Sequence, residues 1–122
     1  MTRETEFWEA IQRIRAKDDR FEPETYPFVL EALEYTYGRI GEVRHVSARE
    51  LFDGLCVYAK ERFGVLAADV LEKWGVRSPF DIGIAVYQLI EVGTLAKQED
   101  DTLEDFDLDV DLRQVIEEEY FD

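Results

Sequence analysis

An acidic segment near the C-terminus, residues 99–111, is the clearest candidate for chemistry in this chain. It contains eight acidic side chains and no lysine or arginine. Four of these acids occupy alternate positions between apolar residues: Asp105, Asp107, Asp109 and Asp111. A period of two is typical of a half-buried β-strand, and it would place all four carboxylates on one solvent face. Two interpretations follow: a docking surface for a basic protein partner, or a solvated strand face whose like charges prevent edge-to-edge pairing.

The spacing of these aspartates does not suit a metal ion. Alternate carboxylates on a strand lie roughly 6 to 7 Å apart and diverge, whereas calcium requires about six to eight oxygens that converge at about 2.4 Å. Val110 also stands where a calcium-binding loop requires glycine. We expect no metal site and no cofactor.

A second candidate lies at the predicted start of a helix. Arg44, His45, Ser47 and Arg49 surround a position where unpaired backbone N–H groups and the helix dipole attract an anion. Alternatively, Ser47 only caps the helix, His45 packs locally and both arginines are solvated. Because His45 is the only histidine, a pair of histidine metal ligands is excluded, and a Ser-His-Asp triad would have to include it.

The other residue types that enzymes use give little support for catalysis. Cys56 is the only cysteine, it lies in the middle of a predicted helix, and we interpret it as buried filler. The sequence contains no glycine-rich phosphate loop and no Gly-x-Ser-x-Gly nucleophile motif. We expect a protein that is not an enzyme.

Helices are predicted to position these candidates. Apolar residues recur at helical spacing over residues 4–17, 24–37, 47–63, 66–74 and 79–92. Ser47 and Glu50 form a capping-box pattern, and Ser78 followed by Pro79 is a typical helix start. Gly54 interrupts the third helix, and a glycine at this place indicates a close crossing with another helix.

The last third of the chain is predicted to contain a β-hairpin. Residues 79–92 would be a recognition helix, residues 94–97 and 105–112 would be the two strands, and an amphipathic turn would follow. Residues 39–46 are predicted to end in another brief strand.

We therefore predict a mainly α (α+β) fold: a winged-helix-like domain with an extra N-terminal helix and a C-terminal acidic β-hairpin. A single domain (1–122) would comprise an N-terminal helix and linker (1–23), a winged-helix-like core (24–112) and a C-terminal tail (113–122).

The charge of the chain is negative and unevenly distributed. The formal net charge is −15, and residues 98–122 contribute −11 of it, because twelve acids there face Arg113 alone. Neither the predicted recognition helix nor the predicted wing carries a cation that could neutralise DNA phosphates, so we expect no useful duplex binding.

These observations leave two hypotheses for function. The leading one is an acidic protein-interaction module, with either a basic partner or self-association as a homodimer. The alternative is a nucleic-acid-associated winged-helix regulator that uses an arginine face away from the wing, formed by Arg39, Arg44, Arg49 and Arg77.

The sequence also bears on location. The first residues are too acidic for a signal peptide, and no apolar run approaches the length of about 18 residues that a membrane span needs. A single cysteine cannot form an intrachain disulfide, so nothing requires an oxidising compartment. We expect a cytoplasmic protein that does not bind membranes.

Several short motifs along the chain resemble those of a known family. They are Arg44-His-Val-Ser47, Phe63-Gly64, Val70-Leu-Glu-Lys-Trp-Gly-Val-Arg-Ser78, Val92-Gly93 and Glu104-Asp-Phe106. They lie within residues 26–112, and the chain is similar to a family of small conserved bacterial proteins of unknown function. The resemblance implies no activity, ligand or catalytic residue.

Overall fold

A computed structural model describes residues 3–97 and 101–120 of the chain. Helices and 3-10 turns follow one another in this order: α1 (Arg3–Lys17), α2 (Thr25–Ile40), α3 (Ala48–Phe63), η1 (Gly64–Leu66), α4 (Ala67–Trp74), α5 (Pro79–Glu91), η2 (Leu103–Phe106) and α6 (Leu112–Tyr120). Each helix expected from apolar periodicity is present, with boundaries that differ by a few residues.

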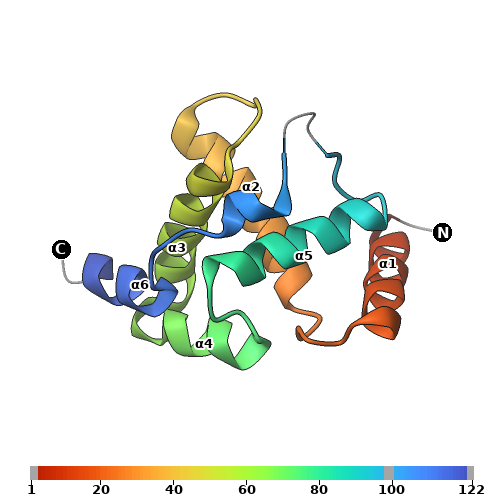
Figure 1. Cartoon of the computed structure of the whole chain (residues 1–122), viewed down its shortest axis with the longest axis horizontal. Coiled ribbons are helices and arrows are strands. Elements are labelled where there is room, and N and C mark those ends of the chain that lie inside the picture. The colour runs from red at the N-terminus through yellow and green to blue at the C-terminus, as the bar shows by residue number, and fades with distance from the viewer. Residues whose placement is uncertain (1–2, 98–100, 121–122) are drawn as a thin grey trace.

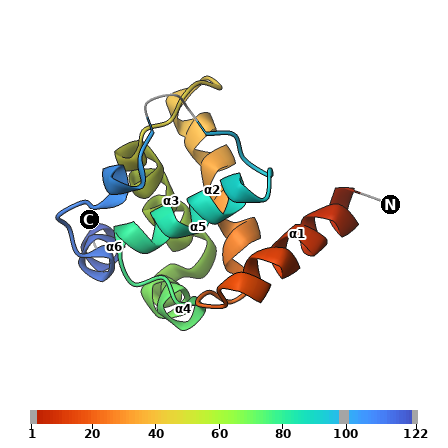
Figure 2. The same ribbon diagram turned by 45° about the vertical axis from the view of Figure 1, so that its right-hand side comes forward.

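The core lies where α2, α3 and α5 meet. Helix α2 packs along α3, α5 contacts α2 on one side and η2 on another, and α6 lies against α3 and α4. Figure 1 shows α1 and α6 at opposite ends of the molecule, and Figure 2 shows α1 leaning away from the body toward its N-terminal end. The buried apolar side chains form one continuous cluster that draws on all six α-helices.

The helix starts that the sequence predicts are confirmed. The Ser47 hydroxyl accepts a hydrogen bond from the Glu50 N–H (3.1 Å), and the Glu50 carboxylate accepts one from the Ser47 N–H (3.0 Å). At α5 the Ser78 hydroxyl accepts a hydrogen bond from the Asp81 N–H (3.2 Å), with Pro79 at the first helical position. These side chains satisfy backbone donors that the first helical turn leaves unpaired.

Gly54 lies at a close crossing of α3 with α2, as its position in the sequence indicates. A Cβ atom built on Gly54 would lie 2.0 Å from the hydroxyl oxygen of Thr36. The Thr36 side chain is buried, and its hydroxyl donates to the Ala32 carbonyl at 2.7 Å. Only glycine therefore allows the two helices to approach this closely.

The predicted winged-helix-like fold with a C-terminal β-hairpin is wrong. No residue in 3–97 or 101–120 is in a β-strand. Residues 94–97 are a bend followed by irregular chain, and the N–H groups of Thr94 and Leu95 both donate to the Leu89 carbonyl near the end of α5. The predicted strand at 105–112 is instead the end of η2, an irregular segment and the start of α6. The brief strand predicted at the end of 39–46 is also absent: α2 continues to Ile40, and residues 41–46 form the loop that leads to α3.

The physical reason is that alternation determines which side chains point inward but cannot provide a partner strand. Phe106 and Leu112 are buried, Leu108 and Val110 are half-buried, and the intervening aspartates are exposed, so the inward and outward positions were predicted correctly. The backbone from 107 to 111 nevertheless forms no ladder. It turns locally, with the Val110 N–H donating to the Leu108 carbonyl at 2.9 Å.

Helix α5 also differs from a recognition helix, because it is part of the core. Ile82 and Leu89 have no exposed surface, and Gly83 and Ala85 are buried with them. A helix enclosed in this way cannot enter a DNA groove.

Candidate functional site

The four aspartates singled out from the sequence have two different roles in the structure. Asp105 accepts a hydrogen bond from the Thr102 N–H (3.1 Å) and closes a capping box at η2. Asp111 accepts from the Gln114 N–H (2.9 Å) and caps α6. Asp107 and Asp109 are exposed, and no arginine among the described residues pairs with either. Asp105 and Asp111 therefore hold the backbone, whereas Asp107 and Asp109 remain available to a partner.

The residues of the predicted anion site are close together, but each cation already faces a carboxylate. Arg44 makes a two-pronged contact with Glu50 (2.7 and 3.2 Å) and a further contact with Glu42 (3.2 Å). Because of its hydrogen bonds to the Arg44 guanidinium and the Ser47 N–H, Glu50 has a pKa lowered to about 2.

The two remaining members of this group are occupied in the same way. Arg49 pairs with Asp53 at 3.1 Å, and the Nε2 atom of His45 lies 3.3 Å from an Asp101 carboxylate oxygen. An incoming anion would have to displace these carboxylates. The anion site stays a prediction, and this geometry counts against it.

The arginine face proposed for nucleic acid stays a prediction, and the positions of its residues count against it. Arg39 is exposed near the end of α2, and no ion pair is found for it among the described residues. Arg44 and Arg49 are paired as described, and Arg62 contacts Glu31 at 2.6 Å. Arg77 lies in the linker between α4 and α5, which Figures 1 and 2 place at the opposite end of the body from the loop between α2 and α3 that carries Arg44. Arg113 on α6 is also paired within its own chain, because its guanidinium nitrogens lie 2.6 to 2.9 Å from carboxylate oxygens of three acids: Asp69, Glu72 and Glu117.

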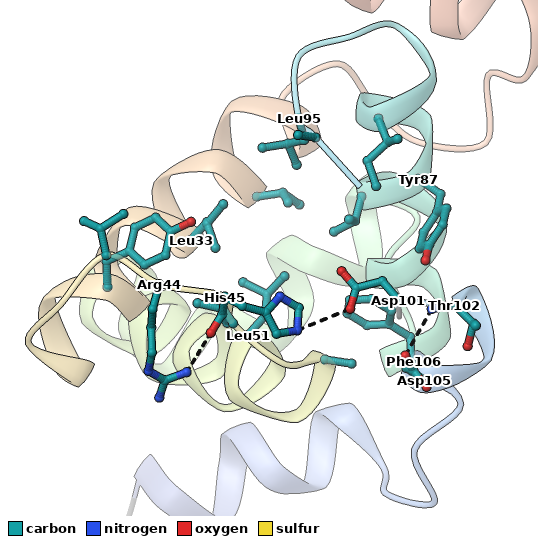
Figure 3. Close-up of a pocket in the computed structure, with 18 residues that line it drawn as sticks. Leu33, Arg44, His45, Leu51, Tyr87, Leu95, Asp101, Thr102, Asp105 and Phe106 are labelled. Carbon is teal, nitrogen blue, oxygen red and sulfur yellow. Dashed lines mark hydrogen bonds and ion pairs between the residues drawn. The ribbon is translucent and has the colours of Figure 1, made fainter. Parts of the chain in front are cut away.

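A pocket of about 330 Å³, here called the α2/α5 pocket, lies beside the acidic segment. Its apolar walls come from five parts of the chain: Val29 and Leu33 on α2, Leu51 on α3, Val86 and Ile90 on α5, Leu95 in the segment after α5, and Phe106 in η2. Figure 3 shows apolar side chains of this lining, Leu33, Leu51 and Leu95 among them, together with the polar side chains of His45 and Asp101 at the rim. Pockets that hold ligands typically measure about 300–1,000 Å³, so this one is large enough to hold an apolar group.

Rigid contacts hold the walls of the α2/α5 pocket in place. Tyr26 on α2 donates its hydroxyl hydrogen to the Gln88 side chain on α5 at 2.7 Å, and burial raises the pKa of Tyr26 to about 12. Phe106 is seated directly on Gly83 of α5, where a Cβ atom would come within 2.6 Å of its side chain. Because Gly83 has no side chain, η2, which is part of the acidic segment, can pack closely against α5.

The rim of the α2/α5 pocket is formed by the loop before α3 on one side and by the described part of the acidic segment on the other. The contact between His45 and Asp101 spans it, and the Arg44 guanidinium donates to the His45 carbonyl at 2.6 Å (Figure 3). Val43 lines the same opening and is 82% exposed, so it adds apolar surface to the rim.

Tyr87 also lines this pocket, and its hydroxyl group has no hydrogen-bond partner among the described residues. Its hydroxyl oxygen is shielded from solvent and makes no hydrogen bond within the described part of the chain. Burial raises the pKa of Tyr87, and the nearby carboxylate of Asp101 raises it further. The phenol is therefore a neutral donor without an acceptor.

The sequence analysis missed the pocket and three residues at its rim: Val43, Tyr87 and Asp101. No local pattern identifies them, because the lining residues are spread from Val29 to Phe106 and meet only after folding. Cys56 is buried, as predicted, and does not line this pocket.

Among residues 3–97 and 101–120, no three His, Cys, Asp or Glu side chains are arranged to hold a metal ion. None of the described helices combines the length and the apolar character needed to cross a bilayer.

Comparison with protein-family models, with curated proteins and with solved structures finds no match to this chain. The resemblance to a family of small bacterial proteins therefore stays a prediction.

Proposed function

We propose that this protein is a non-catalytic interaction module that binds a protein partner with a basic surface. The observation that carries the proposal is the position of the described part of the acidic segment, from residue 101 on, along one side of an apolar pocket. Asp101 and Asp105 line that pocket, and Glu104, Asp107 and Asp109 are exposed beside them in the chain. Carboxylates next to an apolar patch complement a partner that offers lysine or arginine together with apolar side chains.

The charge distribution supports the same partner. Several arginines elsewhere in the molecule contact carboxylates of their own chain, as Arg44, Arg62 and Arg113 do. The acidic segment has no such internal compensation from arginine among the described residues. Its field therefore extends into solvent, where it attracts cationic groups and repels nucleic acid.

A selection from random peptides of about a dozen residues tests this proposal. Wild-type protein should enrich peptides rich in lysine and arginine. A variant with Glu104→Gln, Asp107→Asn and Asp109→Asn should lose that enrichment, because the charges that steer association are gone while the capping aspartates are kept.

The matched control removes the same number of charges from exposed positions outside the segment: Asp19→Asn, Glu22→Gln and Glu34→Gln. It should select the same peptides as the wild type. Peptides without basic bias, or equal capture by the two triple variants, would overturn the proposal. Tight, salt-sensitive binding of random duplex DNA would also overturn it, because a phosphate backbone requires cations that this surface does not offer.

A further inference from the structure

The α2/α5 pocket has the size and lining of an anchor site for one side chain. An apolar cavity of about 150 Å³ is known to accept a benzene molecule, and this pocket has roughly twice that volume. The space suits a single bulky side chain such as tryptophan, phenylalanine or leucine. Interfaces commonly place a large part of their binding energy in one such residue inserted into a desolvated pocket.

The rim shows what must lie next to that anchor. Val43 is 82% exposed at the opening, so an incoming apolar group would cover it. Among the described residues, the basic side chain that Asp101 contacts is His45, at 3.3 Å, and this contact is ionic only when the imidazole is protonated. A lysine or arginine would be a stronger partner for Asp101, because its charge is permanent.

We propose that the α2/α5 pocket binds a short segment of the partner protein in which a bulky apolar residue enters the cavity and an adjacent lysine or arginine contacts Asp101. This inference rests on the proposed function and specifies the chemistry of the partner. A second copy of this chain fits these requirements poorly. Its exposed aromatic residue on α1, Trp8, is flanked by acidic side chains, Glu4, Glu6 and Glu9, that would bring like charge to the acidic segment. Its exposed leucine, Leu66, follows Arg62 in the chain, but Arg62 already pairs with Glu31 at 2.6 Å.

The inference is tested with the most enriched peptide from the selection, labelled with a fluorophore and titrated by fluorescence polarisation. Val86→Phe fills the pocket from α5, and Val43→Ser removes the apolar side chain at the rim. Each should weaken binding about tenfold or more, as expected for loss of an anchor contact. Val43→Ser keeps the test valid if Val86→Phe fails to fold, because an 82% exposed side chain contributes little to the core.

The matched controls are the same two substitutions at Val65, which is 67% exposed and lies in η1, away from the pocket. Val65→Phe and Val65→Ser should bind the peptide like the wild type. Selected peptides should pair an aromatic residue or leucine with a neighbouring lysine or arginine.

Three outcomes would overturn the inference. The first is that the selected peptides are basic, lack an apolar anchor and bind the Val86→Phe and Val43→Ser variants as tightly as the wild type. This result would show that charge alone attracts the partner, and the proposed function would then stand without the anchor. A second such outcome is a peptide whose binding is weakened by Val86→Phe but is as tight to the Glu104, Asp107 and Asp109 triple variant as to the wild type. It would show that the ligand is apolar and needs no basic residue. A wild-type dimer in sedimentation that Val86→Phe dissociates would identify a second copy as the occupant.

Discussion

Substitution of Gly54 by alanine should destabilise the protein, although alanine is the better helix former. Gly54 lies inside α3, where glycine costs about 1 kcal/mol relative to alanine. On propensity alone, Gly54→Ala would raise the free energy of unfolding by that amount. The structure predicts the opposite sign, because the new Cβ atom would lie 2.0 Å from the Thr36 hydroxyl oxygen and 3.1 Å from its Cβ atom.

The magnitude follows from how little Thr36 can move. Its side chain is 2% exposed, and its hydroxyl is bonded to the Ala32 carbonyl on the same helix. The overlap must therefore be relieved by separating α2 from α3. Overpacking of this kind costs about 1–3 kcal/mol. Because the steric overlap here is severe, we expect it to outweigh the gain in helix propensity, and we take this range as the net decrease in the free energy of unfolding.

Urea denaturation followed by circular dichroism measures this loss, and a double-mutant cycle identifies its cause. Thr36→Ala removes the hydroxyl and the methyl group that approach Gly54, so Gly54→Ala should cost at least about 1 kcal/mol less in that background. The same cost in both backgrounds, or a Gly54→Ala variant as stable as the wild type, would refute the reasoning that Thr36 sets the helix separation.

Three further predictions concern single side chains. Leu89→Ala should lower the free energy of unfolding by about 2–5 kcal/mol in denaturant melts, because the fully buried side chain leaves a cavity; a loss below roughly 0.5 kcal/mol would contradict the packing of α5. Asp111→Ala should cost about 1 kcal/mol through the lost α6 cap, while Asp109→Ala, without a capping bond, should be nearly neutral; equal effects would contradict the two roles assigned to these aspartates. Because the pKa of Glu50 is lowered from 4.5 to about 2 in the folded protein, the stability that this carboxylate contributes is present above about pH 4.5 and is lost as the pH falls toward 2. Wild type should therefore exceed Glu50→Gln in melting temperature near neutral pH, and a gap that persists unchanged at pH 2 would contradict the pairing with Arg44.

The sequence by itself determined the features that depend on residues close together in the chain. The capping box at Ser47 and the Ser78 start of α5 need only side chains within one helical turn. Gly54 indicated a close helix crossing because an interior glycine is costly without one. The alternation of aspartates with apolar residues also predicted correctly which side chains after residue 104 point inward.

The tertiary structure decided what that alternating segment becomes and where a partner could bind. A strand requires a neighbouring backbone with free hydrogen-bonding groups, and the N–H groups of Thr94 and Leu95 are bonded to the Leu89 carbonyl instead. Asp105 and Asp111 instead cap η2 and α6, and η2 packs against α5. The α2/α5 pocket had no signal in the sequence, because its walls come from segments that approach one another only after the core has packed.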